Sequence, residues 1–136
     1  MSDEPRWLDS GLVIDFHAEQ LALFGGPEGI RDEGLLESAL ARPLNKFAYG
    51  ETDMAALAAA YGFGSAKNHP FIDGNKRAAL ASMIVFLGLN KLDIEVSSQE
   101  LTAVILSLAA GEISEDVLAQ WLRVHLRPLD APSIQP

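Results

Sequence analysis

Cysteine is absent from this chain of 136 residues, and the sequence also lacks long apolar runs and a surplus of basic side chains. Without cysteine, neither a disulfide framework nor a zinc–thiolate site can form. The longest apolar stretch, residues 78–89, is too short to cross a bilayer and is typical of a buried helix. The N-terminus, Met-Ser-Asp-Glu-Pro-Arg, is acidic where a secretory signal would be basic and then apolar. We therefore expect a cytoplasmic protein without a membrane partner.

Acidic side chains clearly outnumber basic ones. The sequence holds 19 Asp and Glu against 10 Lys and Arg, a formal net charge of −9. Phosphate backbones repel such a chain, which argues against direct binding of nucleic acid through a broad basic face. Basic residues that lie beside a glycine turn are therefore more informative here than they would be in a basic protein.

Helical periodicity and capping signals predict an all-α fold, a compact bundle of about six helices. Residues that suit the N-terminal ends of five of these helices are Asp9 or Ser10, Asp32, Thr52, Ser97 and Ser114. Residues 75–89 are apolar on nearly every side, which predicts a helix at the centre of the bundle. The last helix is expected to continue until Pro128.

Other segments are expected to be less regular. Residues 42–51 contain Pro43 and Gly50 and are expected to form an exposed loop or small hairpin, and residues 92–96 a short strand without a sheet. No internal repeat or linker divides the chain. We expect one domain over residues 1–128, followed by a flexible tail over residues 129–136.

The turn before the helix at residues 75–89 gathers polar groups that a helix bundle does not need for packing. Gly74 lets the main chain come close to a ligand. Asn75, Lys76 and Arg77 form the first helical turn, whose free N–H groups and dipole favour an anion. Two cations at this end oppose the dipole, and a bound polyphosphate would account for them.

Two further side chains complete the minimum parts of a phosphoryl-transfer site. Asp73 can hold Mg²⁺ beside phosphates, because this ion prefers oxygen ligands and keeps several waters. His69 can accept a proton from an attacking hydroxyl. Phe71 lies between them and is expected to turn inward and pin the loop.

The same residues also suit an ordinary turn. In that interpretation His69 is a turn residue before proline, Asp73 caps the next helix, and Lys76 and Arg77 are solvated. Composition and spacing alone leave both interpretations open. His17 and His125, on other helices, are interpreted as structural residues.

A resemblance favours the functional interpretation. The segment from His69 to Arg77 reads His-Pro-Phe-Ile-Asp-Gly-Asn-Lys-Arg. It resembles the motif of Fic proteins, His-x-Phe-x-(Asp/Glu)-Gly-Asn-Gly-Arg-x-x-Arg, and is more similar still to the death-on-curing (Doc) branch, in which Lys follows the Asn. Residues 24–26 with His17 upstream, residues 29–43, and Ala48-Tyr49 ahead of Glu51 also resemble that branch. The similarity covers about residues 12–90.

Specific roles follow from this resemblance. It implies that His69 is the general base for a target hydroxyl, that Asp73 is the Mg²⁺ ligand, and that the phosphates of ATP are bound by Gly74, Asn75, Lys76 and Arg77. Lys67 and Asn68 would add contacts. The loop at residues 42–51 would correspond to the flap that positions the target segment.

The resemblance also implies a biological role, that of a toxin in a toxin–antitoxin system. Doc proteins are expected to transfer the γ-phosphate of ATP to a threonine of elongation factor Tu and so to block translation. No Ser/Thr-x-x-x-Glu-(Gly/Asn) inhibitory sequence is present, so control is expected from a cognate antitoxin whose disordered segment folds on binding.

Two positions depart from the wider Fic pattern. Lys76 stands where adenylyl-transferring members carry Gly, and Leu80 stands where they carry a second Arg. The Doc branch shares both departures. Adenylyl transfer to a protein hydroxyl remains one alternative, and a catalytically inactive module that binds an antitoxin is another.

Overall fold

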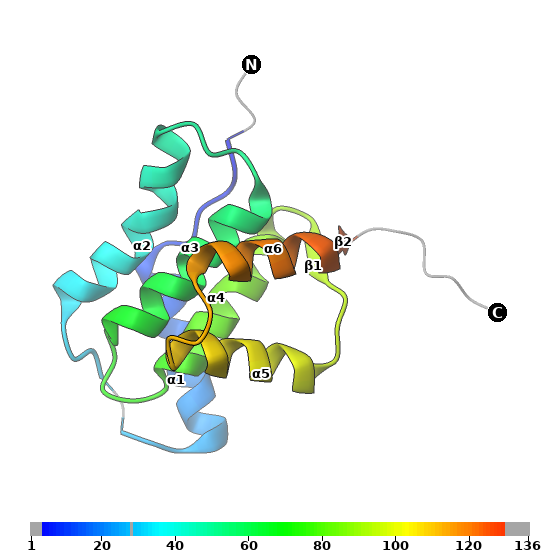
Figure 1. Ribbon diagram of the computed structural model, residues 1–136. Helices are drawn as coiled ribbons and strands as arrows, with labels where there is room; N and C mark the ends of the chain where they lie inside the picture. The colour runs from blue at the N-terminus through cyan, green and yellow to red at the C-terminus, as the bar shows by residue number, and fades with distance from the viewer. Residues whose placement is uncertain (1–3, 28, 130–136) are drawn as a thin grey trace.

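Six α-helices and one two-stranded sheet make up the structure, a computed structural model that describes residues 4–27 and 29–129. The predicted all-α bundle of about six helices is confirmed (Figure 1). In chain order the elements are α1 (Ser10–Phe24), α2 (Glu33–Ala48), α3 (Met54–Asn68), α4 (Asn75–Leu89), β1 (Leu92–Ile94), α5 (Ser98–Ala109), α6 (Glu115–His125) and β2 (Leu126–Pro128). Residues 130–136 of the expected tail lie outside the described ranges. Within those ranges, no helix has the length and apolar character needed to cross a bilayer.

Side-chain caps explain why the sequence locates five of the six helices well. In each case the cap oxygen accepts the main-chain N–H three residues later, which stabilises the helix by about 1 kcal/mol. The five capping residues are Asp9, Asp32, Asp53, Ser97 and Ser114. The cap expected at Thr52 is wrong by one residue, because Asp53 Oδ2 accepts from Ala56 N at 3.3 Å.

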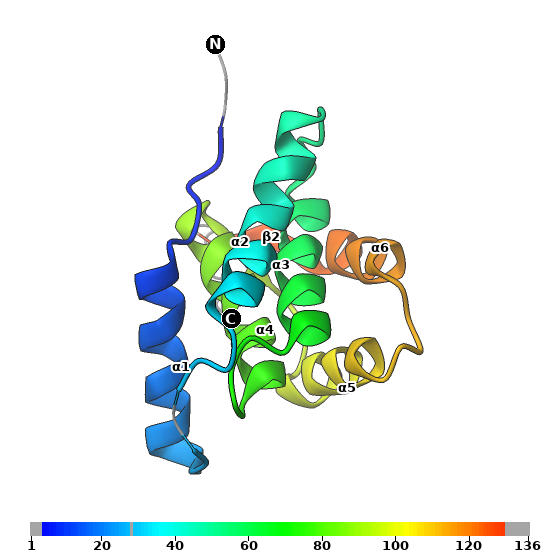
Figure 2. The same cartoon turned by 90° about the vertical axis from the view of Figure 1, so that its left-hand side faces the viewer.

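The most enclosed helix is α3, not α4 as the apolar pattern predicts. Eleven of the 15 residues of α3 are buried, and the helix packs against α2, α4 and α6, whereas Ile84 of α4 is 41% exposed. Two glycines allow this close packing: a Cβ at Gly62 would lie 3.1 Å from Met83 Cγ of α4, and one at Gly64 would lie 3.0 Å from Ala39 Cα of α2. Figure 2 shows α1 on one side of the central helices and α5 and α6 on the other.

The loop expected over residues 42–51 is largely helical, so that prediction is wrong. Helix α2 continues through Pro43 to Ala48. Proline in a helix interior costs about 3 kcal/mol, but Pro43 is fully buried on the same face as Leu36 and Leu40, and this packing keeps the helix continuous. Only residues 49–53 remain to connect α2 to α3, at the opposite end of α3 from residue 69 (Figure 1).

The segment near residue 92 does form a sheet, contrary to expectation. Strand β1 pairs with β2 in antiparallel register, with Asp93 opposite Arg127. Helix α6 accordingly ends at His125 rather than at Pro128. The partners are more than thirty residues apart, and Leu-Arg-Pro carries no strand signal of its own, so the sequence does not reveal the pairing.

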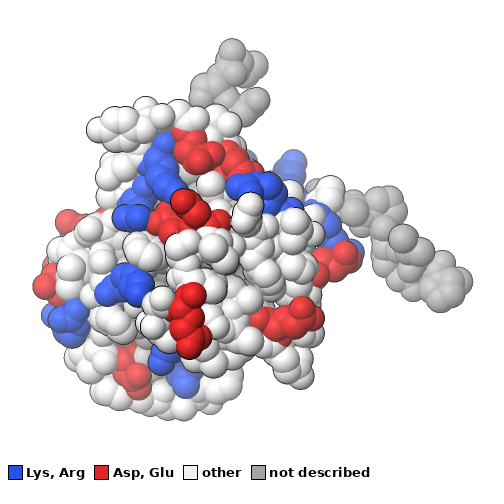
Figure 3. Space-filling view, viewed as in Figure 1, with Lys and Arg blue, Asp and Glu red and all other residues white. Residues whose placement is uncertain are grey.

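Acidic and basic side chains are interspersed on the face shown in Figure 3. One ion network joins α2 to α6. Glu115 is 8% exposed, its Oε1 accepts from Arg42 Nε at 2.8 Å, and its Oε2 lies 2.8 Å from Lys46 Nζ. These basic residues are therefore already paired with a carboxylate.

Candidate active site

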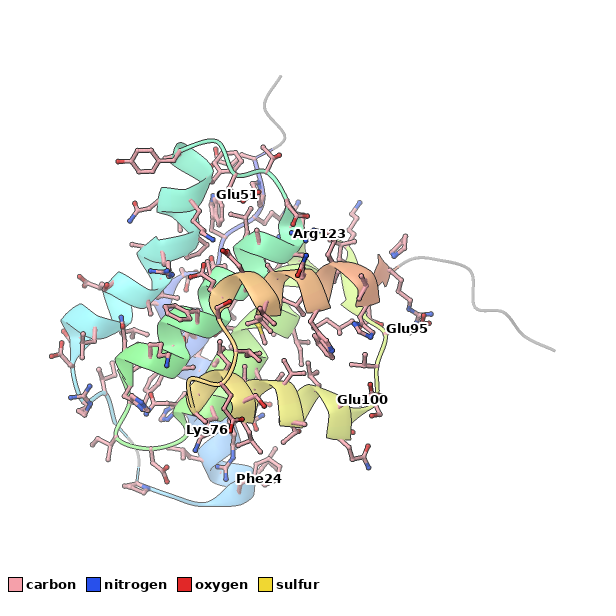
Figure 4. The ribbon with its side chains drawn as sticks, viewed as in Figure 1. Phe24, Glu51, Lys76, Glu95, Glu100 and Arg123 are labelled. Atoms are coloured by element: carbon pink, nitrogen blue, oxygen red, sulfur yellow. The ribbon has the colours of Figure 1, made fainter. Side chains whose placement is uncertain are left out.

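The turn between α3 and α4 lines a cavity of about 310 Å³. The lining residues are His69, Ile72, Asp73, Gly74, Asn75, Lys76 and Arg77, which include the predicted base, the predicted metal ligand and the four predicted phosphate-binding residues. Figure 4 shows Lys76 and Phe24 near one end of the molecule and Glu51 near the other. The structure therefore brings the predicted residues together and separates them from residues 49–51.

A larger hollow of about 630 Å³ lies beside the C-terminal part of α2. Its charged groups are engaged elsewhere: Arg42 and Lys46 pair with Glu115, and Glu51 accepts the N–H of Asp53 at 3.0 Å. No histidine lines it. The smaller cavity, where a histidine, a carboxylate and a helix N-terminus meet, is the better candidate.

His69 ends α3 in an unusual conformation. Its φ of 49° and ψ of 57° lie in the left-handed region, which is rare for a residue other than glycine and more so before proline. Such a conformation costs about 1–3 kcal/mol and persists only where surrounding contacts hold it. The residue is exposed and lines the cavity, so its imidazole is accessible to a target hydroxyl.

Two side chains hold the motif turn from inside. Asn75 Oδ1 accepts from Phe71 N, and Asn75 Nδ2 donates to Phe71 O, both at 2.9 Å. Phe71 is 1% exposed, as the sequence predicts, and its ring stacks on His17 with centroids 3.7 Å apart. Because these two bonds hold the side-chain amide on Phe71, the group of Asn75 that belongs to the open end of α4 is its main-chain N–H.

His17 of α1 is the structural residue that its helical position predicts, but the sequence does not reveal what it contacts. It is 4% exposed, and its Nε2 lies 2.5 Å from Asp73 O. A main-chain carbonyl oxygen can only accept a hydrogen bond, so Nε2 of His17 is the donor and carries the hydrogen. His17 thereby ties α1 to the main chain of the predicted metal ligand.

The N-terminus of α4 differs from those of the other five described helices, because no side chain caps it. Its N-cap is Gly74, with a φ of 78°, and a Cβ there would lie 3.3 Å from His17 Nε2. Glycine suits position 74 for two reasons apart from any ligand: the φ there is positive, and His17 leaves little room for a side chain. Among the described residues, the N–H groups of Asn75, Lys76 and Arg77 have no acceptor, and together with two cations they suit an anion.

Asp73 keeps one carboxylate oxygen available. Oδ1 accepts from Gly74 N at 2.8 Å, which is a local turn contact and not a cap of α4. Oδ2 faces Gly26, where a Cβ would lie only 2.6 Å away. Within the described residues, no group of three or more His, Cys, Asp or Glu could hold a metal ion by itself. One carboxylate oxygen beside a phosphate site fits Mg²⁺, which binds through few protein ligands together with waters and substrate phosphates.

The segment beside the motif is residues 29–32, not the predicted flap at 42–51. An isolated antiparallel bridge joins Ile30 to Phe71, and Ile72 N donates to Gly29 O at 3.1 Å. Arg31 reaches the carbonyls of residues 68 and 69. The sequence does not predict a role for Arg31 at the site. The signals in the sequence are its position between Gly29 and the helix cap Asp32 and its place in the segment 29–43, which contributes to the resemblance.

Residues near the motif differ in whether they contribute to the cavity. Asn68 Nδ2 donates to Leu35 O at 3.0 Å, and neither Asn68 nor Lys67 lines the cavity. Phe24, at the end of α1, is 64% exposed and carries the guanidinium of Arg77 5.0 Å above its ring centroid. Leu80 packs against the core, so no second cation is available at that position.

Comparison with known proteins places the chain in a family. Residues 7–87 match the family described as Fic/DOC family. The chain is 36% identical over 112 residues to the protein kinase doc of Escherichia phage P1, an alignment that covers 82% of this chain and 88% of that protein. It is 42% identical over 74 residues to the toxin Doc of Mycolicibacterium smegmatis strain ATCC 700084, which covers 52% of this chain and 56% of that protein.

Proposed function

Since this chain belongs to the Fic/DOC family, we propose that it is a Doc-type toxin that transfers the γ-phosphate of ATP to a protein hydroxyl. The target that the resemblance implies is a threonine of elongation factor Tu, and the partner that controls the toxin is a cognate antitoxin. One observation carries the proposal. A single cavity is lined by the exposed His69, by the carboxylate residue Asp73 and by the uncapped N-terminus of α4.

The phosphates of ATP bind at the start of α4. The main-chain N–H groups of residues 75–77 donate to phosphate oxygens, and Lys76 and Arg77 compensate their negative charge. Asp73 would hold Mg²⁺, and the ion would neutralise part of the phosphate charge. The ring of Phe24 supports the guanidinium of Arg77 on the outer side of the cavity.

His69 acts on the target. An imidazole nitrogen accepts the proton of the threonine hydroxyl as the hydroxyl oxygen attacks the γ-phosphorus. The bond between that phosphorus and the bridging oxygen of ADP breaks, and ADP leaves with the electron pair. Lys76 and the N–H groups of α4 stabilise the charge that develops on the transferring group.

Transfer of the γ-phosphate rather than of AMP is supported by two positions. Lys76 places a cation at the edge of the phosphate site, where the adenylyl-transferring pattern has bare glycine. Leu80 packs against the core and supplies no cation for the far end of the triphosphate. With both changes, a nucleotide that presents its terminal phosphate to the target is the more favourable orientation.

The decisive experiment uses ATP labelled at either the γ- or the α-phosphate. The purified protein is incubated with elongation factor Tu, and label on the factor is measured. Label from the γ position alone supports the kinase, and label from the α position shows adenylyl transfer. Absence of both, with mass spectrometry of host proteins showing no added phosphate or AMP, would favour the inactive antitoxin-binding module.

A growth assay tests the proposed role of His69 as the general base. Expression without antitoxin is expected to arrest bacterial growth, and His69→Ala should relieve the arrest at equal protein level, because no other histidine lines the cavity. His125→Ala is the matched control. His125 bonds Trp121 O at 2.7 Å within α6, so this variant should still arrest growth. Arrest by soluble His69→Ala protein would exclude His69 as the base.

A further inference from the structure

Arg31 lies outside the motif, and we propose that it is a positioning residue that holds His69 in its working conformation. The proposal rests on the function proposed above, because it takes His69 as the base. It adds a contribution from the segment before α2, which supplies none of the residues that line the cavity.

Three successive carbonyl groups accept hydrogen bonds from this one residue. Nε of Arg31 donates to His69 O at 2.7 Å, and a terminal guanidinium nitrogen donates to Asn68 O at 2.9 Å. Its main-chain N–H donates to Pro70 O at 2.7 Å. The guanidinium is planar with donors in a fixed fork, so the two side-chain bonds set the direction of both carbonyls. The positive charge also suits the C-terminal end of α3, where the helix dipole is negative.

His69 needs this restraint because its left-handed backbone is disfavoured twice, by its Cβ and by the proline that follows. Residues before proline normally adopt an extended conformation. A return to that conformation would rotate the Cα–Cβ bond and carry the imidazole away from the cavity. The carbonyls that Arg31 holds are the ones that this rotation would move.

Arg31 is itself well placed to act as a fixed support. The next residue, Asp32, caps α2 through Leu35 N at 3.0 Å. Gly29 O accepts from Ile72 N, and Asp32 N donates to Pro70 O at 3.1 Å. The segment is therefore anchored to α2 on one side and to the motif turn on the other. The side chain of Arg31 is the part of this connection that a substitution can remove without changing the main chain.

Steady-state kinetics of Arg31→Lys separates positioning from binding. Lysine keeps the charge near the end of α3 but loses the fork, so kcat should fall by about a hundredfold, the loss typical of a small misplacement. KM for ATP should change little, because the phosphate-binding groups lie on α4. Arg127→Lys is the matched control, since Arg127 pairs with Asp93 and Glu95 on the small sheet and should leave kcat unchanged. Ethylguanidinium should restore part of the activity of Arg31→Ala, and ethylammonium should not.

The second measurement does not depend on activity. The three histidines give three Cε1–H signals in a proton–carbon correlation spectrum, and the one lost in His69→Ala belongs to His69. That signal should move in Arg31→Lys and stay in place in Arg127→Lys. If it stays in place in Arg31→Lys and kcat is unchanged, the proposal is wrong. Lower thermal stability with an unmoved His69 signal would also overturn it, because Arg31 would then be purely structural. If the wild-type protein transfers no label while the signal moves, the proposed function fails and the restraint on His69 stands.

Discussion

Asn75→Ala is expected to release the motif turn, because the side-chain amide of Asn75 forms two hydrogen bonds with the main chain of Phe71. Each neutral bond contributes about 1 kcal/mol, and the N–H and C=O of Phe71 lose their partners in a partly buried turn. Alanine recovers about 0.5 kcal/mol through helix propensity. We expect a net loss of about 2 kcal/mol, which for a chain of this length lowers the unfolding midpoint by about 7 °C.

Asn90→Ala provides a matched control elsewhere on the molecule. Asn90 Oδ1 accepts from Arg6 N at 2.9 Å, and its Nδ2 donates to Arg6 O at 3.0 Å, as the amide of Asn75 does with Phe71. Asn90 Nδ2 also donates to Phe86 O at 2.8 Å. Both variants should therefore unfold at lower temperature than wild type. Only Asn75→Ala should lose transfer of labelled phosphate when both are assayed below their midpoints, because only Asn75 holds the turn between His69 and α4.

Two results would refute this reasoning. If Asn75→Ala unfolds at the same temperature as the wild-type protein, the bonds from His17 to Asp73 O and from Ile72 to Gly29 O hold the turn without the Asn75 side chain. If both variants lose stability and both keep full transfer activity, the geometry of the turn does not limit the reaction. Scanning calorimetry and the labelled-ATP assay together distinguish these cases.

Asp73→Asn should keep the local bond from Gly74 N through its Oδ1 and so leave stability nearly unchanged, while it weakens Mg²⁺-dependent binding of ATP. Titration calorimetry with and without Mg²⁺ checks this, and an unchanged affinity for Mg-ATP would leave Asp73 as a turn residue. Burial raises the pKa of Tyr61 to about 12 from 10.0, against the opposing hydrogen bond from Leu8 N. Below pH 10 the phenol is neutral in both states, and between pH 10 and 12 the unfolded chain loses its proton first. Stability should therefore fall by about 2–3 kcal/mol over that interval. Urea unfolding on either side of pH 10 should show this fall, and Tyr61→Phe should lack it; an identical fall in the variant would contradict the assignment.

Local chemistry made much of this protein readable from its sequence. Helix caps act over three residues, so Asp9, Asp32, Ser97 and Ser114 locate their helices without knowledge of the fold. The motif from His69 to Arg77 is equally local. Its residues are near one another in the chain, and the turn and first helical turn that they form bring them to one cavity.

Only the tertiary structure decided which distant segments meet this motif. Pro43 stays within α2 because its ring is buried, a gain that no local propensity contains. His17 reaches Asp73 across 56 residues, and Arg31 reaches His69 across 38. Each of these contacts depends on how α1 and α2 pack against α3 and α4, since a single hydrogen bond is too weak to bring such distant segments together. The sequence by itself therefore determined the residues that can do chemistry, and the packing of the helices decided what holds them in place.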